Sequence, residues 1–466
     1  MADSRHRRRG ARAFATRLAL LLILSFALSA RPVLAQEVLR DAETEALLHD
    51  AARPIMAAAG LRPENVQIVM LQDRQINAFV AGGQTVYIQS GLIEAAQNVN
   101  EVQGVIAHEL GHVTGGHVIR MAEGAKAATG IMLLSLLLGA AAMAAGSGDA
   151  GAGIMAAGQQ AAMGKFLAFT RVQENSADQA GASFLNKAGI TGKGMLSFFK
   201  TLQNQEYRLA IPQVDSYSST HPLTGERIAA LEQVLESAPS WNAPVDPKLE
   251  ERFQLVKAKL SGFVNDPQAT LYKFPESNHS LPARYARAYA WHKSAYPDKA
   301  AAEVEELIKA RPDYPYFQEL KGQILLESGK PAEALDSLRK AVQLAPNQPL
   351  IASLLGHALI ETGNEANFAE AKRVLRSAVG RDNDNPFAWY QLGIVYDHEG
   401  DHARASLATA ERYNLEGNPR LAMVNAEQAL QGIPTGSPDW IRAQDIAMVS
   451  RTEVEKDKKD KKDKKK

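Results

Sequence analysis

The chain has 466 residues, 45% of them hydrophobic and 22% charged, which is enough for two or three domains with at least one large core. Its 52 basic and 52 acidic residues balance, but residues 1–35 carry seven Arg and one Asp and residues 456–466 carry eight Lys and three Asp, so the body between them is acidic. An acidic body argues against a nucleic-acid binder, and the lack of cysteine excludes disulfides, thiolate metal sites, iron–sulfur clusters and cysteine nucleophiles.

The N-terminus has the pattern of a secretory signal peptide. Six arginines precede an uncharged apolar run at 18–30, and Val33-Leu34-Ala35 places small residues before Gln36. The apolar run is shorter than the about 20 residues that span a bilayer, which argues against the alternative of an uncleaved anchor. We expect residues 1–35 to be removed on export, which in a Gram-negative bacterium leads to the periplasm.

Hydrophobic periodicity predicts the elements that follow in chain order. They are an amphipathic helix at 36–60, strands at 66–71 and 85–88 around the Gly82-Gly83 turn, and helices from about 92 to 236. A proline-rich break at 237–248 ends this part, and a helix near 249–263 bridges to the next.

A second apolar run, at 127–148, has no charged residue. Its length allows a transmembrane helix, but its second half is rich in Gly and Ala, which hold a single helix poorly. We interpret it as an apolar segment that borders the functional site and touches a membrane surface or an unfolded client. A true membrane span at 127–148 is the alternative.

The C-terminal half contains an internal repeat. Gly322 and Gly356 are 34 residues apart, as are Gly329 and Gly363, and the same positions recur 37 residues further on. A period of 34 residues with two helical patterns per unit resembles tetratricopeptide repeats, which stack into a solenoid with a concave partner-binding surface. We expect about four units between 283 and 417 and a degenerate pair after them.

These patterns predict a mainly α chain with a small β-sheet, that is, an α+β domain followed by an all-α solenoid. The domains are then the signal at 1–35, the first domain at 36–245, a helical linker at 246–282, the repeats at 283–450 and a disordered Lys/Asp tail at 451–466.

The chemistry lies in the sequence His108-Glu109-Leu110-Gly111-His112. On a helix, His108 and His112 are one turn apart on one face, so both imidazoles can bind one metal ion. Glu109 projects beside them, where it can take a proton from a water on the metal. The apolar residues at 101–107 would bury this site.

A zinc site needs a third protein ligand, and the segment from Glu174 to Asp178 offers two carboxylates on one helix face. One of them can bind the metal while the other orients a ligand histidine. His117 follows at the end of the same helix as His112, and we expect a structural role for it.

These residues resemble the HtpX-like gluzincin metallopeptidases, and the appended repeats make the chain similar to the periplasmic BepA-type protease-chaperones. The stretches that carry the resemblance are Asn77-Ala78-Phe79, Gly82-Gly83, Gly91-Leu92, the run into His108, the helix from Arg171 to Asp178, and Ser219-Thr220-His221-Pro222 with Arg227. The resemblance implies a zincin-type fold and one Zn²⁺ per chain, held by His108, His112 and Glu174. It also implies Glu109 as general base and Asp178 as support for a ligand.

The same resemblance implies a role for His221 and a set of partners. His221 would occupy the fourth zinc position and keep the enzyme inactive until it moves; stabilising the oxyanion or a purely structural role are the alternatives. The implied clients are unfolded or misassembled envelope proteins, and the repeats would dock on the outer-membrane β-barrel assembly machinery. Nucleic acid is not an expected partner. Peripheral contact with a membrane through residues 127–148 is expected.

Substrate would lie extended along the strand at 85–88 if that strand is an edge of the sheet, bound mainly through its backbone. We therefore name Asn77, Val86, Tyr87 and Arg227 as candidate substrate-binding residues. Three functions stay open at this point: a zinc endopeptidase in quality control, a repeat chaperone or adaptor with a latent protease site, and a membrane-embedded protease that spans at 127–148.

Overall fold

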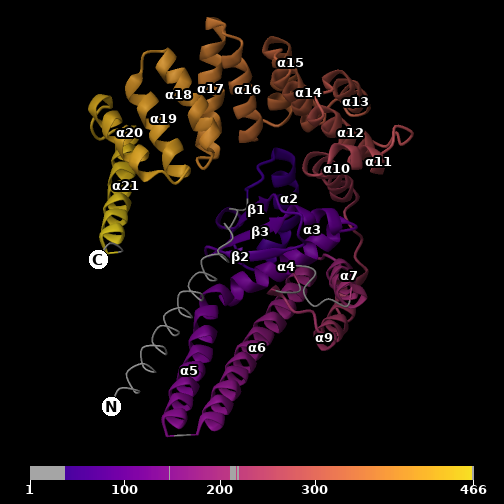
Figure 1. The fold of residues 1–466 in the computed structure, drawn as a ribbon. Coiled ribbons are helices and arrows are strands. Elements are labelled where there is room, and N and C mark those ends of the chain that lie inside the picture. Colours follow the sequence, from indigo (N-terminus) through magenta and orange to yellow (C-terminus); the bar gives the residue numbers. More distant parts are fainter. Residues whose placement is uncertain (1–36, 146, 210–216, 218–219, 464–466) are drawn as a thin grey trace, which may run out of the picture.

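The computed structural model describes residues 37–145, 147–209, 217 and 220–463. The predicted signal peptide at 1–35 lies outside these residues. Figure 1 shows a first domain around a small sheet, an arc of paired helices that follows it, and a long helical hairpin that projects from the first domain on the side away from the arc. The predicted fold class, a mainly α chain with a small sheet before a repeat solenoid, is confirmed.

The sheet has three strands in the order β1-β3-β2. Strand β1 (Gln67–Leu71) runs parallel to β3 (Thr85–Gln89), and β2 (Ala78–Ala81) runs antiparallel to it. Gly82 and Gly83 form the turn between β2 and β3 with φ of 61° and 97°, values that favour glycine. The predicted strands at 66–71 and 85–88 are confirmed, β2 was not predicted, and the expectation that 85–88 is an edge strand is wrong because β3 lies in the centre.

The sheet packs against the helices of the first domain. Besides the hairpin these are α2 (Ala42–Ala58), α3 (Ser90–Ala95), α4 (Val99–Gly115), α7 (Lys193–Leu209) and α9 (Gly225–Glu236), with short turns η1 (Pro63–Asn65) and η2 (Pro239–Asn242). Helix α4 is the core helix, since every residue from Val99 to His112 is buried. Asn98 caps its N-terminus by accepting the Glu101 amide, and Gly116 ends it in the left-handed conformation with φ 63°.

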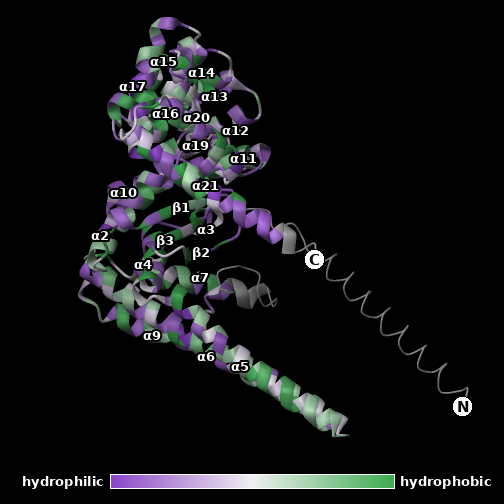
Figure 2. Cartoon of the chain, turned by 90° about the vertical axis from the view of Figure 1, so that its left-hand side faces the viewer, coloured by the Kyte–Doolittle hydropathy of each residue, from purple (hydrophilic) through white to green (hydrophobic). Residues whose placement is uncertain are grey.

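The projecting hairpin consists of α5 (His117–Ala144) and α6 (Gly148–Lys187). The Gly/Ala-rich part does not form a single helix, as expected, because α5 ends at Ala144 and α6 begins at Gly148; the two arms pack along their length. Only the base of the hairpin borders the first domain, and the apolar segment leads away from it (Figure 2).

Helices α10 (Pro247–Val264) and α11 (Pro267–Lys273) occupy the predicted linker. The arc then contains five consecutive helix pairs: α12 (Leu281–Lys293) with α13 (Pro297–Ala310), α14 (Pro315–Glu327) with α15 (Pro331–Leu344), α16 (Pro349–Glu361) with α17 (Glu365–Arg381), α18 (Pro386–His398) with α19 (His402–Leu415), and α20 (Pro419–Gly432) with α21 (Pro438–Asp463). The recurring glycines have two different reasons: a Cβ at Gly322 or Gly356 would overlap a leucine of the paired helix, whereas Gly329, Gly363 and Gly400 have positive φ. The structure differs from the prediction in the tail, where α21 continues through the Lys/Asp sequence to Asp463, a composition in which opposite charges one turn apart favour helix.

A buried polar cluster joins the first domain to the repeats. The Lys259 Nζ on α10 lies 2.5 Å from Asp41 Oδ2 and 3.3 Å from Glu43 Oε2 at the start of α2. The hydroxyl groups of Tyr285 and Tyr314, on α12 and α14, donate to the Glu43 carboxylate at 2.7 and 2.5 Å. Elements from both parts of the chain therefore share one set of buried hydrogen bonds.

Candidate metal centre

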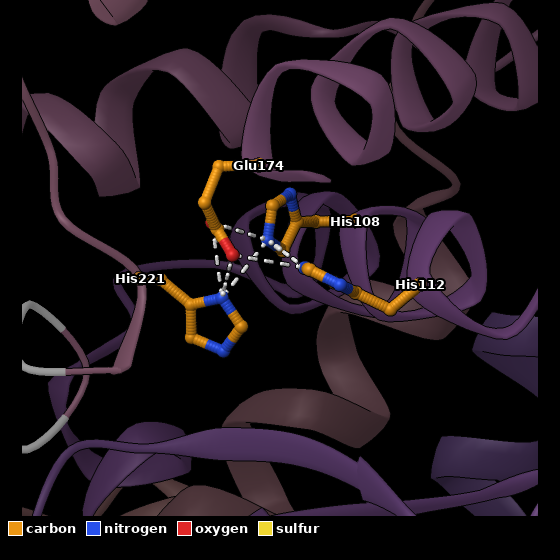
Figure 3. A group of neighbouring side chains, drawn as sticks. All are labelled: His108, His112, Glu174 and His221. Atoms are coloured by element: carbon orange, nitrogen blue, oxygen red, sulfur yellow. Dashed lines mark hydrogen bonds and ion pairs between the residues drawn. The ribbon is translucent and has the colours of Figure 1, made fainter. Parts of the chain in front are cut away.

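Four side chains from three segments converge beneath the sheet. Helix α4 supplies His108 and His112, α6 supplies Glu174, and the segment before α9 supplies His221. All four side chains are buried, and one nitrogen or oxygen from each lies within 4.8 Å of the others (Figure 3).

The nitrogen and oxygen atoms of these side chains that could bind a metal lie close together. Nε2 of His108 is 3.0 Å from Nε2 of His112 and 3.3 Å from Nδ1 of His221. The Glu174 carboxylate is 3.1 Å from the same His221 nitrogen and 3.3–3.4 Å from the other two imidazoles. Four lone-pair donors that point at one place fit a tetrahedral cation, and three nitrogens with one carboxylate oxygen suit Zn²⁺.

Glycines let α4 and α6 come close enough to bring these ligands together. A Cβ at Gly111 would lie 2.6 Å from the Ala177 carbonyl oxygen, and a Cβ at Gly181 would lie 3.0 Å from the Ala107 carbonyl carbon. Larger residues would separate the two helices. The close approach of the two backbones therefore brings Glu174 beside the two histidines.

A second layer holds the ligands in place. Oδ1 of Asp178 is 2.9 Å from Nδ1 of His108, so this nitrogen donates its hydrogen and leaves Nε2 free to face the centre. The Arg227 guanidinium donates to Asp178 at 2.5 and 2.9 Å and lies 2.9 Å from Glu174 Oε2. Arg227 thus contacts both the candidate ligand Glu174 and the Asp178 carboxylate that holds the candidate ligand His108.

The charges explain the pKa values at the centre. Burial lowers the pKa of His108, but hydrogen bonds with Asp178 and Glu174 outweigh it and raise the value to about 9. Burial raises the pKa of Asp178, but hydrogen bonds from Arg227 and His108 lower it below its usual range. Both carboxylates at the centre stay ionised, since the Glu174 pKa is also lowered by the surrounding histidines against its burial.

Glu109 lies fully buried next to this group without a hydrogen-bond partner for either carboxylate oxygen among the described residues. Its Oε1 is 3.6 Å from Nε2 of His221. A buried carboxylate is costly when it has no partner. Its position beside the metal ligands fits a base that awaits a water molecule.

The sequence profile of Peptidase family M48 matches residues 13–235, which contain all of these side chains. The chain carries a peptidase family M48 domain. The profile of the tetratricopeptide repeat matches residues 294–349 and 355–419, so the M48 domain is followed by the predicted repeats.

Curated relatives match part of the chain. The chain is similar to the beta-barrel assembly-enhancing protease of Escherichia coli K12, with 26% identity over 275 residues that cover 57% of this chain and 55% of the relative. It is also 30% identical to Metalloprotease LoiP of Escherichia coli K12 over 169 residues, 36% of this chain and 60% of that one. The match thus spans a little over half of the length of these relatives.

Among solved structures, MamA is similar to part of the chain. It has 22% identity and a TM-score of 0.28 and covers 37% of this chain and 96% of MamA.

Two residues of the M48 domain were missed as parts of the site. His117, expected to be structural, is buried at the start of α5 with Nδ1 3.0 Å from Nδ1 of His112. Tyr217 is fully buried with its ring centroid 4.7 Å from that of His221, and its hydroxyl has no partner among the described residues. The sequence offers a signal only for His117, whose distance of five residues from His112 allows a contact across Gly116.

The four candidate substrate-binding residues of the M48 domain lie in different environments. Val86 is fully buried on β3, and Tyr87 stacks on Phe79 of β2 with ring centroids 5.1 Å apart. Asn77 precedes β2 and accepts a hydrogen bond from Thr220 at 3.3 Å, next to His221. Arg227 contacts Asp178 and Glu174, which places it as a positioning residue behind the ligands.

Proposed function

We propose that this chain is an exported zinc-dependent endopeptidase that hydrolyses peptide bonds of unfolded or stalled envelope proteins. The convergence of His108, His112 and Glu174 beside Glu109, whose carboxylate accepts no hydrogen bond from the described residues, is the observation that carries the proposal. The signal-like N-terminus and the names of the relatives support a periplasmic location and a role in outer-membrane protein assembly.

The residues of the centre divide the chemistry between them. His108, His112 and Glu174 would hold the zinc ion, which would supply Lewis-acid polarisation of the scissile carbonyl and make water a better nucleophile at neutral pH. Glu109 takes a proton from the attacking water and delivers it to the amine nitrogen that leaves. Asp178 holds His108 in the tautomer that presents Nε2, and Arg227 holds both carboxylates in place.

His221 restrains this activity in the proposal. Its Nδ1 stands within 3.1–3.3 Å of Glu174 and His108, at the place of a fourth ligand, where a catalytic zinc site keeps an open position for water. The enzyme would become active when the segment that carries His221 moves. Oxyanion stabilisation by His221 after such a movement is the alternative role.

The free edge of β2 supports backbone recognition of an extended substrate. With β3 in the centre of the sheet, a client strand would pair with Ala78–Ala81, beside Asn77, rather than with β3. Backbone pairing selects little by sequence, which suits unfolded clients. The repeats would supply the docking surface for the assembly machinery, and a chaperone or adaptor with a latent protease site is the second candidate function, favoured by the position of His221.

Cleavage of an unfolded outer-membrane β-barrel precursor by the purified chain tests the proposal, with Glu109→Gln as the matched variant. We expect cleavage by the wild type, loss of cleavage in Glu109→Gln, and one zinc per chain in both. Zinc binding without cleavage in either protein would favour the latent chaperone, and equal cleavage by both would overturn the role of Glu109.

A further inference from the structure

The α5–α6 hairpin has its polarity reversed compared with a helix pair in water. The buried positions of α5 are His117, Gly124, Ser135 and Gly139, whereas Leu133, Leu134 and Leu137 are 56%, 58% and 69% exposed. Only 11% of the most apolar 18-residue window of α5 is buried. Large apolar side chains therefore face outward and small ones lie between the arms, as in membrane helix pairs.

Small residues at the contact let the two arms pack closely. A methyl group at Gly158 would overlap Ser135, and one at Gly151 would overlap the Gly139 carbonyl. The close approach of the arms thus depends on small residues, while the leucines at the centre of α5 are more than half exposed. Whatever covers these exposed leucines must therefore come from outside the hairpin.

The exposed apolar surface surrounds α5 rather than forming one stripe. The exposed large side chains at its centre are Met132, Leu133, Leu134, Leu136, Leu137 and Leu138. Successive residues of a helix point about 100° apart, so these positions cover most of its circumference. A protein groove would cover one face, whereas lipid surrounds a helix, and this distribution favours lipid.

The length of the uncharged part fits a bilayer. Asp149 at the tip is the only charged residue between Lys126 on α5 and Lys165 on α6. The contacts of Gly124 with Phe169 and of Gly158 with Ser135 place the two lysines at about the same level of the hairpin. From Lys126 to Ala144 the helix extends about 27 Å, close to the ~30 Å of the hydrocarbon core.

We infer that the α5–α6 hairpin inserts into the hydrocarbon core of a phospholipid bilayer, with Lys126 and Lys165 at the membrane surface. Both inserted arms are continuous helices, whose backbone groups are paired within the helix apart from those at the helix ends near the tip. The lysines lie at the headgroup phosphates, and at full depth Asp149 reaches the opposite headgroup region. Gln159 and Gln160 make α6 the less apolar arm, so the leucines of α5 carry the insertion.

Insertion fixes the distance between the metal centre and the membrane. His117, which contacts His112, precedes Lys126 by nine residues, and Glu174 follows Lys165 by nine. Nine residues of helix extend about 14 Å. Both arms thus hold the centre just above the surface, and if the proposed protease function is correct, cleavage is confined to polypeptides at the membrane.

Because the chain has no cysteine, a single introduced cysteine can carry an environment-sensitive fluorophore at one known place. We would label Leu137→Cys in the exported, processed chain and add vesicles of phosphatidylethanolamine and phosphatidylglycerol. The emission is expected to rise and shift to shorter wavelength, and nitroxides on the lipid acyl chains are expected to quench it. Val424→Cys, at a position in the repeats that is 51% exposed against 69% for Leu137, is the control and should not respond.

Two further measurements distinguish insertion of the hairpin into a bilayer from its binding to another partner, such as an unfolded polypeptide. Leu133→Asp with Leu137→Asp should abolish the flotation of the protein with vesicles while its zinc content stays unchanged, which shows that it is folded. No response of the Leu137 probe to vesicles, or the same response at Val424, would overturn the inference. A response to an unfolded polypeptide but not to vesicles would also overturn it and assign the hairpin to client binding.

Discussion

Nδ1 of His117 lies 3.0 Å from Nδ1 of His112. Because His112 faces the metal centre with Nε2, its Nδ1 carries the hydrogen and donates it to His117. His117 therefore does for His112 what Asp178 does for His108: it fixes the tautomer and the orientation of the ring. The Asp178 side chain that supports His108 is charged, whereas the His117 side chain that supports His112 is neutral.

Replacing His117 with alanine is expected to weaken zinc binding about 10- to 100-fold, because outer partners of metal ligands contribute on that scale. The affinity can be measured by competition with a chromophoric chelator. His398→Ala, which changes a histidine of the repeats that pairs with Glu365, is the control and should leave the affinity unchanged. An unchanged affinity in a folded His117→Ala protein would show that the contact has no positioning role.

Replacing His221 with alanine separates its proposed roles. If the side chain occupies the open zinc position, its removal raises the initial rate of cleavage at saturating zinc and lowers zinc affinity, since one of four ligands is lost. If the side chain stabilises the oxyanion, the rate falls by about 10²–10³-fold instead. The exposed His49→Ala serves as the control, and an initial rate equal to the wild type would leave His221 neither role.

The sequence predicts the parts of the centre that local geometry determines. His108 and His112 are one turn apart on any helix, and Glu174 stands with Asp178 in a recognisable segment. The position of His221 depends instead on how the segment before α9 packs against α4, which no local pattern encodes. The resemblance alone indicated that His221 would come to the zinc position.

The sheet and the hairpin show two other limits of sequence reasoning. Strand β2 (Ala78–Ala81) has four residues and no clear alternation, so neither it nor the central position of β3 could be derived. In the hairpin, Gly and Ala were counted as weak helix formers, although they are what lets α5 and α6 pack together. The helix does break within the Gly/Ala-rich part, between Ala144 and Gly148, but the contact between the two arms is not encoded by local propensity.

The junction between the M48 domain and the repeats should make stability depend on pH through Glu319. Burial raises its pKa to about 8 despite Lys259, and its Oε2 has no partner among the described residues. Between about 4.5, the pKa of the unfolded chain, and about 8, the folded chain binds the extra proton, so stability falls as pH rises.

Glu319→Gln removes this dependence, since the amide stays neutral. The melting temperature of the variant should exceed that of the wild type at pH 8.5, and the difference should shrink toward pH 5, where Glu319 of the folded wild type is protonated. Circular dichroism melts at both pH values measure this, with the exposed Glu276→Gln as control. An equal shift at pH 5 and pH 8.5 would mean that ionisation of Glu319 plays no part.

Lys259 is the only cation that the described structure places within ion-pair distance of both Asp41 and Glu43. Lys259→Met leaves two buried carboxylates without their cation and should destabilise the chain by about 3–5 kcal/mol, the usual cost of breaking a buried pair. Thermal unfolding measures the loss, and the exposed Lys248→Met is the control. Adding Glu43→Gln to Lys259→Met should restore part of the stability, because one of the uncompensated charges is removed, while the amide oxygen still accepts from one tyrosine hydroxyl and the amide NH2 can donate to the other. If the double variant is no more stable than the single one, the loss comes from packing of the lysine side chain rather than from its charge.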